Sequence, residues 1–271
     1  MKRPYALAIV RKDLKLLRRS RPVMISLISL PVILLVVLPA TLVGFAVLAE
    51  VLGVQHDLDG ILQSFSPEAT APLSGYTTSQ KFVYVALTYF MAPLYLILPL
   101  LVSVVIAADS FAGEKERQTL EALLYTPTTD WELLLGKVVA SWLPAVLVAL
   151  FGFGFYSITA NAVAWPVMKH IFFPNSMWFV LVLWVAPAIT GIGIGLTVLL
   201  SAWVEGFQEA YQLGNLVVMP MLALFIQEVR GVIAFDLQFV FLLGAGLWLV
   251  NAGLLYFGYG FVKRDRLTRS V

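Results

Sequence analysis

Six apolar segments, each long enough to cross a lipid bilayer, constrain the fold of this 271-residue sequence more than any other feature. A helix needs about 20 consecutive, mostly apolar residues to span a hydrocarbon core about 30 Å thick. Hydrophobic residues make up 60% of the chain and charged residues only 13%, which is more apolar than an ordinary soluble domain. The sequence therefore predicts an all-α integral membrane protein with six transmembrane helices. The expected spans are 23–49, 82–108, 138–160, 177–203, 211–228 and 238–261.

The basic residues are distributed unevenly between the two sides of these spans. All but three of the 18 Lys and Arg residues fall on one side, and the exceptions are Lys81, Lys169 and Arg230. Because basic loops stay in the cytoplasm, we expect both termini there and the loop 50–80 outside. The expected location is the cytoplasmic membrane, in contact with lipids. A formal net charge of only +2 gives no indication of a nucleic-acid partner.

The first 21 residues form an amphipathic pattern. Leu7, Val10, Leu14 and Leu17 recur at spacings of three and four, and basic residues occupy many of the other positions. A helix of this kind lies along the inner membrane surface, with its basic side chains among anionic headgroups. We therefore expect residues 1–21 to form an interfacial helix that joins the first span to a cytoplasmic partner. The alternative is a basic patch that only sets the orientation of the chain.

A long polar segment, 109–137, separates the second span from the third on the cytoplasmic side. It greatly exceeds the about 2–8 residues that usually connect helices in a bundle, so we expect it to contact another molecule. Its composition predicts one helix from Asp109 to about Leu124, ended by Pro127, and a second helix that leads into the third span. In the first helix, charged side chains are spaced to pair with one another and three leucines form an apolar edge. The charged residues are Glu114, Glu116, Arg117 and Glu121, and the leucines are Leu120, Leu123 and Leu124.

Within this segment, the stretch AGEKERQTLEALLYTPTTDWELLLGK resembles the signature of ABC type-2 transporter permeases, in both order and location. At Gln118 the family usually has Gly, a departure that we expect to be harmless because helices tolerate Gln better than Gly. A weaker resemblance occurs in EGFQEAYQLGNLVVMP, which is similar to the start of the family's fifth span. The positions that match the signature are Glu114, Glu116, Arg117, Thr119, Leu120, Glu121, Pro127, Gly136 and Lys137.

The resemblance implies a single ABC type-2 transmembrane domain over 1–271, acting as the permease subunit of an ATP-driven exporter. It implies pairing with a second copy or a related permease, and docking on a separate ATP-binding subunit that holds ATP and Mg. Cargo of a lipid-like or amphipathic, drug-like kind is expected. In this reading, 110–125 is a coupling helix within the coupling region 109–137, and the alternative is a solvated charged loop. The residues expected to couple the chain to the ATP-binding subunit are Glu114, Glu116, Arg117, Thr119, Leu120, Glu121 and Leu124.

Other functional classes receive less support from the sequence. The chain is not expected to be an enzyme or to hold a cofactor, because Gly136 and Lys137 lack the remainder of a phosphate-binding P-loop. A membrane-embedded enzyme would need a catalytic or metal-binding cluster, and only the external residues His56, Asp57 and Asp59 offer one. An ion-coupled secondary transporter is the other alternative. Such carriers place ionisable groups within their spans, and none is evident near the middle of these spans.

The sequence indicates the residues of the transport pathway less clearly than those of the coupling region. Aromatic and methionine side chains on the second and fifth spans are candidates to line it, although such residues also contact lipid or neighbouring helices. Gly191 and Gly195 have the spacing that lets two helices approach closely. The charges of the stretch QEVRGVIAFD, 227–236, are expected near water in a short re-entrant element. The candidate pathway residues are Tyr89, Met91, Tyr95, Tyr211, Met219 and Phe225.

Overall fold

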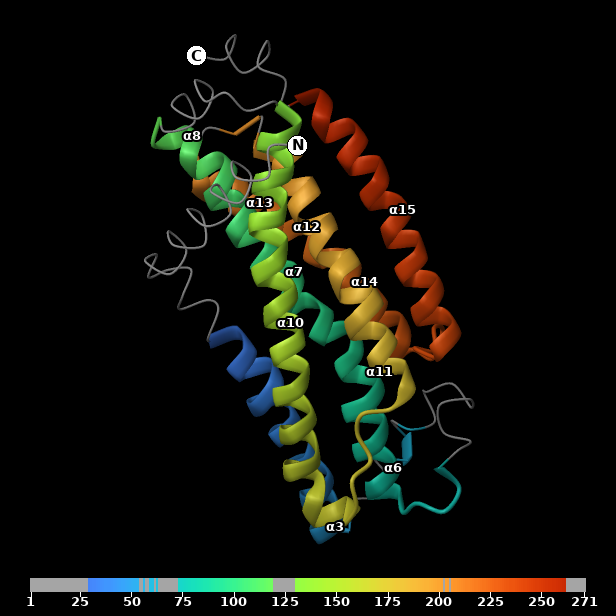
Figure 1. Ribbon diagram of the computed structural model, residues 1–271. Coiled ribbons are helices and arrows are strands. Elements are labelled where there is room, and N and C mark those ends of the chain that lie inside the picture. The colour runs from blue at the N-terminus through green and yellow to red at the C-terminus, as the bar shows by residue number, and fades with distance from the viewer. Residues whose placement is uncertain are drawn as a thin grey trace.

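The computed structural model describes residues 29–53, 56, 59–60, 62, 73–118, 130–201, 203–204 and 206–261. This part of the chain is a bundle of helices (Figure 1). Six helices are long and apolar enough to cross a membrane, which confirms the predicted all-α membrane fold. They are Ser29–Leu52, Thr78–Glu116, Leu134–Met168, Ser176–Ser201, Phe207–Val229 and Leu237–Tyr256. The expected interfacial helix at 1–21 lies outside the described residues.

Local π turns, and one 3₁₀ turn in the fifth helix, divide these helices into shorter elements. The π turns are η1 (Ile33–Val37), η3 (Ala86–Phe90), η4 (Asp109–Gly113) and η5 (Leu181–Val185), and the 3₁₀ turn is η6 (Asn215–Val217). The α-helical elements are α3 (Leu38–Leu52), α6 (Thr78–Val85), α7 (Met91–Ala108), α8 (Glu114–Glu116), α10 (Asp130–Met168), α11 (Ser176–Val180), α12 (Ala186–Ser201), α13 (Phe207–Gly214), α14 (Val218–Val229) and α15 (Leu237–Phe261).

One sequence prediction about these elements is wrong. The second helix does not end at residue 108, because η4 and α8 continue it to Glu116. As far as it is described, the helix expected from Asp109 to about Leu124 is therefore the continuation of the second helix, which gives way to a turn where Gln118 adopts a left-handed φ of 56°. Residues 119–124 lie outside the described residues. Residues 230–236, within the stretch expected to form a re-entrant element, form turns and bends followed by residues without regular secondary structure, and the re-entrant element stays a prediction. The helix expected to lead into the third span is confirmed, because α10 begins at Asp130 and continues to Met168.

The second helix occupies the centre of the bundle. All but two residues of α7 are buried, and α7 packs against α10, α12, α13 and α14 (Figure 1). The same helix continues through η4 into α8, at the end of the bundle where α13 begins.

At the π turn η3, side chains of neighbouring helices donate hydrogen bonds to backbone carbonyls of the second helix. A π turn disturbs the regular helical hydrogen bonding and leaves carbonyl groups in need of other donors. The Tyr156 hydroxyl donates to the carbonyl of Leu87 at 2.6 Å, and the Trp178 indole N–H donates to the carbonyl of Thr88 at 2.7 Å. Their rings also contact each other, with centroids 5.1 Å apart. These donors join the third and fourth helices to the second one.

Small residues bring α12 and α15 together. A Cβ atom added at Gly191 would lie 2.4 Å from Oδ1 of Asn251, and one at Gly195 would lie 3.0 Å from the Leu254 side chain. The close helix packing predicted for this glycine pair is thus confirmed, within a single protomer. The Asn251 amide also donates to the carbonyl of Ala188 at 2.7 Å, which fixes the two helices in register.

We expect Gly244→Ala to destabilise the protein, because the new Cβ atom would lie 2.2 Å from the Trp184 ring. That ring is stacked on Phe241 with centroids 5.8 Å apart, so it cannot move without losing contacts. Overpacking of this kind costs about 1–3 kcal/mol. Gly246→Ala is the matched control on the same helix, since its Cβ atom would meet nothing within 4 Å. Equal melting temperatures of the two variants in the same detergent would contradict this packing.

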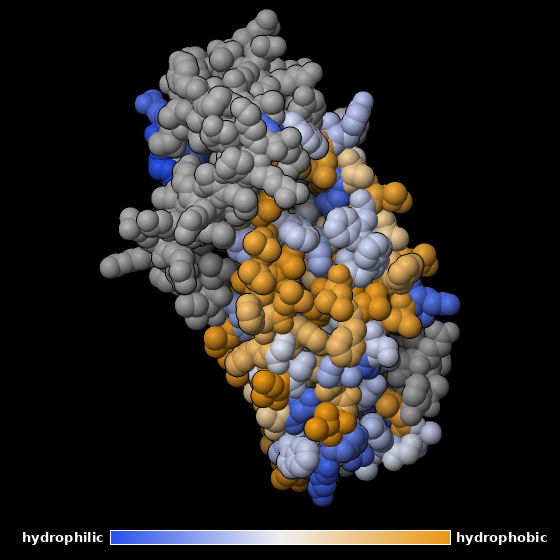
Figure 2. All heavy atoms as spheres, viewed as in Figure 1, coloured by the Kyte–Doolittle hydropathy of each residue, from blue (hydrophilic) through white to orange (hydrophobic). Residues whose placement is uncertain are grey.

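The outer surface is suited to lipid. Large apolar side chains are exposed on the peripheral helices, and Figure 2 shows hydrophobic residues gathered across the middle of one face. Exposing such an apolar surface to water is unfavourable, whereas contact with the hydrocarbon of a bilayer carries no such cost. The six helices and this surface together indicate a multi-pass membrane protein. Examples of the exposed residues are Leu48, Phe151, Ile158, Leu242 and Leu249.

Candidate functional site

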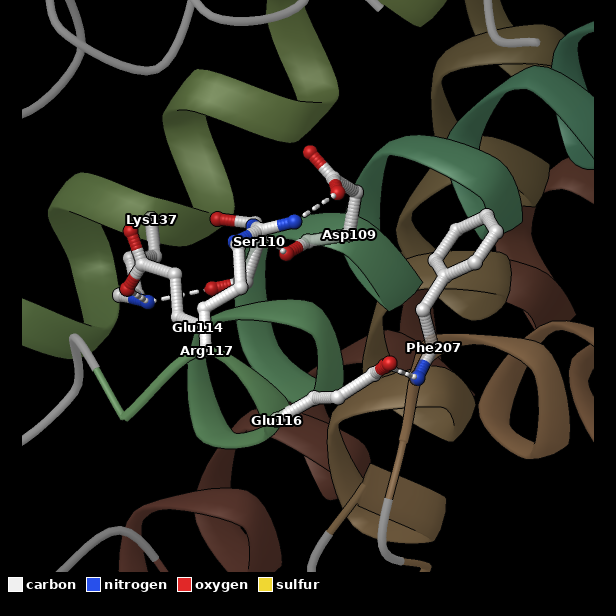
Figure 3. A network of polar contacts seen from close by, with 7 residues as sticks. All are labelled: Asp109, Ser110, Glu114, Glu116, Arg117, Lys137 and Phe207. Atoms are coloured by element: carbon white, nitrogen blue, oxygen red, sulfur yellow. Dashed lines mark hydrogen bonds and ion pairs between the residues drawn. The ribbon is translucent and has the colours of Figure 1, made fainter.

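A network of polar contacts joins three helices at the end of the second one (Figure 3). We call it the coupling network. It connects η4 and α8 of the second helix to α10 of the third and to α13 of the fifth. Its members are Asp109, Ser110, Glu114, Glu116, Arg117, Lys137 and Phe207.

A buried ion pair fixes the second helix to the third. The ammonium group of Lys137 donates to the carboxylate of Glu114 and to the carbonyl of Ser110, and it lies 4.9 Å from the centre of the Phe111 ring. Lys137 is 1% exposed and Glu114 3% exposed, so both charges are removed from water. Removing one partner of such a pair is strongly unfavourable, which makes this contact rigid.

A second contact connects the same segment to the fifth helix. The backbone N–H of Phe207, the first residue of α13, donates to Oε2 of Glu116 at 2.9 Å. Gly206 occupies the N-cap position and has no side chain that could accept this hydrogen bond. The Glu116 carboxylate therefore supplies the missing cap from another helix, and its negative charge favours the α13 N-terminus. A Cβ atom at position 206 would lie only 2.9 Å from that carboxylate oxygen.

Two further contacts order the end of the second helix. The Lys115 ammonium donates to the carbonyl of Val204 at 3.0 Å, in the connection that precedes α13. The Arg117 guanidinium donates to Oδ1 of Asp109 at 3.0 Å and to its carbonyl at 3.2 Å. The guanidinium is half exposed, so this ion pair contributes only about 0–1 kcal/mol. Arg117 therefore serves mainly to close the helix end.

Of the predicted coupling residues, the structure brings Glu114, Glu116 and Arg117 together in one network. Glu114 pairs with Lys137, Glu116 accepts from Phe207, and Arg117 pairs with Asp109. The pairing expected within the first helix also involves Glu121, which lies outside the described residues, so it stays a prediction. The network is completed by Lys137, which belongs to the signature, and by Asp109, Ser110 and Phe207, none of which was predicted as a coupling residue. The other predicted coupling residues lie outside the described residues, and they are Thr119, Leu120, Glu121 and Leu124.

Gln118, which departs from the signature, has a backbone conformation that is not helical. Gln118 has φ of 56° and is exposed in the turn that ends the second helix. Glycine adopts this left-handed conformation without a steric penalty, whereas other residues adopt it at a cost. Helix propensity is therefore the wrong criterion for judging Gln at this position, since the backbone here is not helical.

The candidate pathway residues fall into two groups. Met91 and Tyr95 are completely buried inside the protomer, where the Tyr95 hydroxyl donates to the carbonyl of Ala149 on α10. They pack the core in this conformation and do not face an open pathway. The others are partly or largely exposed, and they are Tyr89, Tyr211, Met219 and Phe225.

Comparison with known families decides what kind of protein carries this network. A family profile described as ABC-2 family transporter protein matches residues 7–244. The chain belongs to the ABC-2 transporter family. A search of curated proteins finds no match to it. The resemblance carried by the signature is thereby confirmed, and this ABC-2 permease is a membrane component of a transporter rather than a catalytic domain. Membership also implies association, in general terms, with an ABC ATP-binding subunit.

Proposed function

We propose that this ABC-2 permease is the transmembrane subunit of an ATP-driven exporter, and that the coupling network passes motion from a separate ATP-binding subunit to the third and fifth helices. One observation carries the proposal: a single helix end is bonded to both of those helices. The two bonds differ in kind. The Glu114–Lys137 pair is buried, while Glu116 and its bond to Phe207 are exposed.

This difference suggests how the network works. A buried ion pair is costly to separate, so the second and third helices move together. An exposed cap contributes only about 0.5–2 kcal/mol, so the start of α13 can separate and return during a transport cycle. The ATP-binding subunit would bind at the coupling region 109–137, which contains α8, on the cytoplasmic side. ATP and Mg belong to that subunit.

The fifth helix is the best candidate to line the pathway with a second permease copy or a related permease. Its described surface is mostly exposed in the single protomer, and it carries the exposed polar residues Gln208 and Gln212. Polar side chains are unfavourable against hydrocarbon, so a neighbouring protomer or cargo is the better environment. Tyr211 and Met219 on the same helix suit a lipid-like or amphipathic cargo. Both chain termini would lie in the cytoplasm, with the protein in the cytoplasmic membrane.

Co-expression with candidate ATP-binding subunits tests the proposal. We expect mass measurement of the purified assembly to show both kinds of subunit, and we expect Leu120→Asp to reduce recovery because it places a charge at the proposed contact. Val232→Asp is the matched control, since Val232 is exposed in the connection between α14 and α15, away from the coupling network. Robust ATP hydrolysis by the purified permease alone, or full recovery of the Leu120→Asp complex, would contradict the proposal.

A further inference from the structure

A buried carboxyl group lies at the opposite end of the fifth helix from the coupling network. Glu228 is in the last turn of α14 and is 3% exposed. Neither of its carboxyl oxygens has a hydrogen-bond partner, although both are completely buried. It is the only acidic residue with this property among the residues that the structure describes. An unpaired carboxyl group in such a place requires a physical explanation.

The described elements that pack most closely against α14 carry no basic side chain. α14 packs against α7 and η3, whose titratable side chains are the neutral phenols Tyr95 and Tyr89. Tyr89 is close enough to both Glu228 and Asp236 to interact with them electrostatically. Asp236 would add negative charge, and it is exposed. Arg230, on the turn after α14, is also exposed, and within the described residues it forms no ion pair with Glu228.

We propose that Glu228 is a proton-binding site that couples the conformation of this end of the bundle to pH. Burying an unpaired carboxylate is far more costly than burying the neutral acid. The conformation described here therefore holds the acid form. When the end of α14 separates from η3 and α7, water reaches the carboxyl group, its O–H bond breaks and the proton passes to water. No oxidation or reduction takes part.

The direction of the pH dependence follows from this exchange. The closed conformation binds the proton and the open conformation releases it, so rising pH favours opening. One proton linked to the equilibrium changes it by up to about tenfold per pH unit. Phe225 on α14 and Phe90 on η3 are in contact, with ring centroids 5.9 Å apart, and we expect this contact to separate on opening. This inference does not depend on the proposed coupling to an ATP-binding subunit, because it concerns the chain alone.

Infrared spectroscopy tests the protonation directly, with the full chain in lipid nanodiscs at neutral pH. The carbonyl stretch of a protonated carboxylic acid is separate from the carboxylate bands. We expect a protonated-acid band that shifts when the glutamates carry ¹³C and that Glu228→Gln removes. Glu209→Gln is the control on the same transmembrane helix, because Glu209 is exposed and should not contribute to this band. An unchanged band in Glu228→Gln, or no isotope-sensitive band in the parent chain, would overturn the proposal.

Thiol labelling tests the linked opening, and the chain has no native cysteine to interfere. In nanodiscs, we expect the reaction rate of a cysteine at Phe225 to rise with pH relative to a cysteine at Val232, which is already exposed. The ratio of the two rates removes the pH dependence of the thiol itself. In the Glu228→Gln background the ratio should stay constant. A ratio that does not change with pH in the parent background, or that changes equally in the Glu228→Gln background, would overturn the linkage.

Discussion

Replacing Lys137 with Met is expected to destabilise the folded permease by about 3–5 kcal/mol. The substitution keeps most of the side-chain volume but removes the cation that faces the buried Glu114 carboxylate. A buried charge that loses its partner has neither water nor an opposite charge to stabilise it. The free energy of unfolding, obtained from a denaturant titration in mixed micelles, measures the effect.

Two comparisons show whether the effect arises from the charge pair. Combining Lys137→Met with Glu114→Gln removes both charges, so the double variant should recover much of the loss. Arg117→Ala removes an exposed ion pair of the same network and should cost only about 0–1 kcal/mol. A loss in Lys137→Met no larger than that in Arg117→Ala, or a strictly additive double variant, would show that the buried pair does not stabilise the helix end.

Glu116→Ala is expected to weaken the transmission of ATP-driven motion to the fifth helix while ATP hydrolysis continues. The variant removes the carboxylate that caps α13 at Phe207. Loss of an N-cap costs about 0.5–2 kcal/mol, which corresponds to about a 2- to 30-fold change in an equilibrium. The measurement uses the permease reconstituted with its ATP-binding subunit and a single cysteine at Met219. It compares the thiol reaction rate with and without ATP, and records hydrolysis in the same sample.

Glu116→Gln separates the cap from a general effect of substitution. The amide oxygen still accepts the Phe207 N–H, so this variant should retain more of the ATP-dependent change than Glu116→Ala. Val139→Ala on α10 is the control, because Val139 is exposed and belongs to no contact of the coupling network. An ATP-dependent change in Glu116→Ala equal to that of the parent protein would contradict a role for this cap.

The membrane fold was largely predictable because hydropathy is a local property. A run of about 20 apolar residues implies a spanning helix whatever surrounds it. Helix ends were less predictable, since a helix can continue past the bilayer. The second helix does so through η4 to Glu116, although its apolar run ends near residue 108. The π turns depend on donors from other helices, such as Tyr156 and Trp178, and no pattern in the second span predicts them.

The candidate site was predictable only in part, because its contacts join residues on different helices. The signature contains Glu114, Glu116 and Lys137, but residues 23 and 91 positions apart form the decisive contacts. No sequence spacing indicates such pairs. The burial of Glu228 was also predicted wrongly. Its place at the end of the span 211–228 predicted a side chain near water. The structure turns it inward, since burial depends on which side of the last helical turn faces α7 and η3.

The most direct test of the account is whether ATP moves the fifth helix through another subunit. A single cysteine at Met219, in a chain that has no other, reports this in nanodiscs when its thiol reaction rate is measured with and without ATP. We predict an ATP-dependent change when the ATP-binding subunit is present and no change when the permease is alone. An equal response to ATP in the permease alone, or no response in a complex that hydrolyses ATP, would contradict the account.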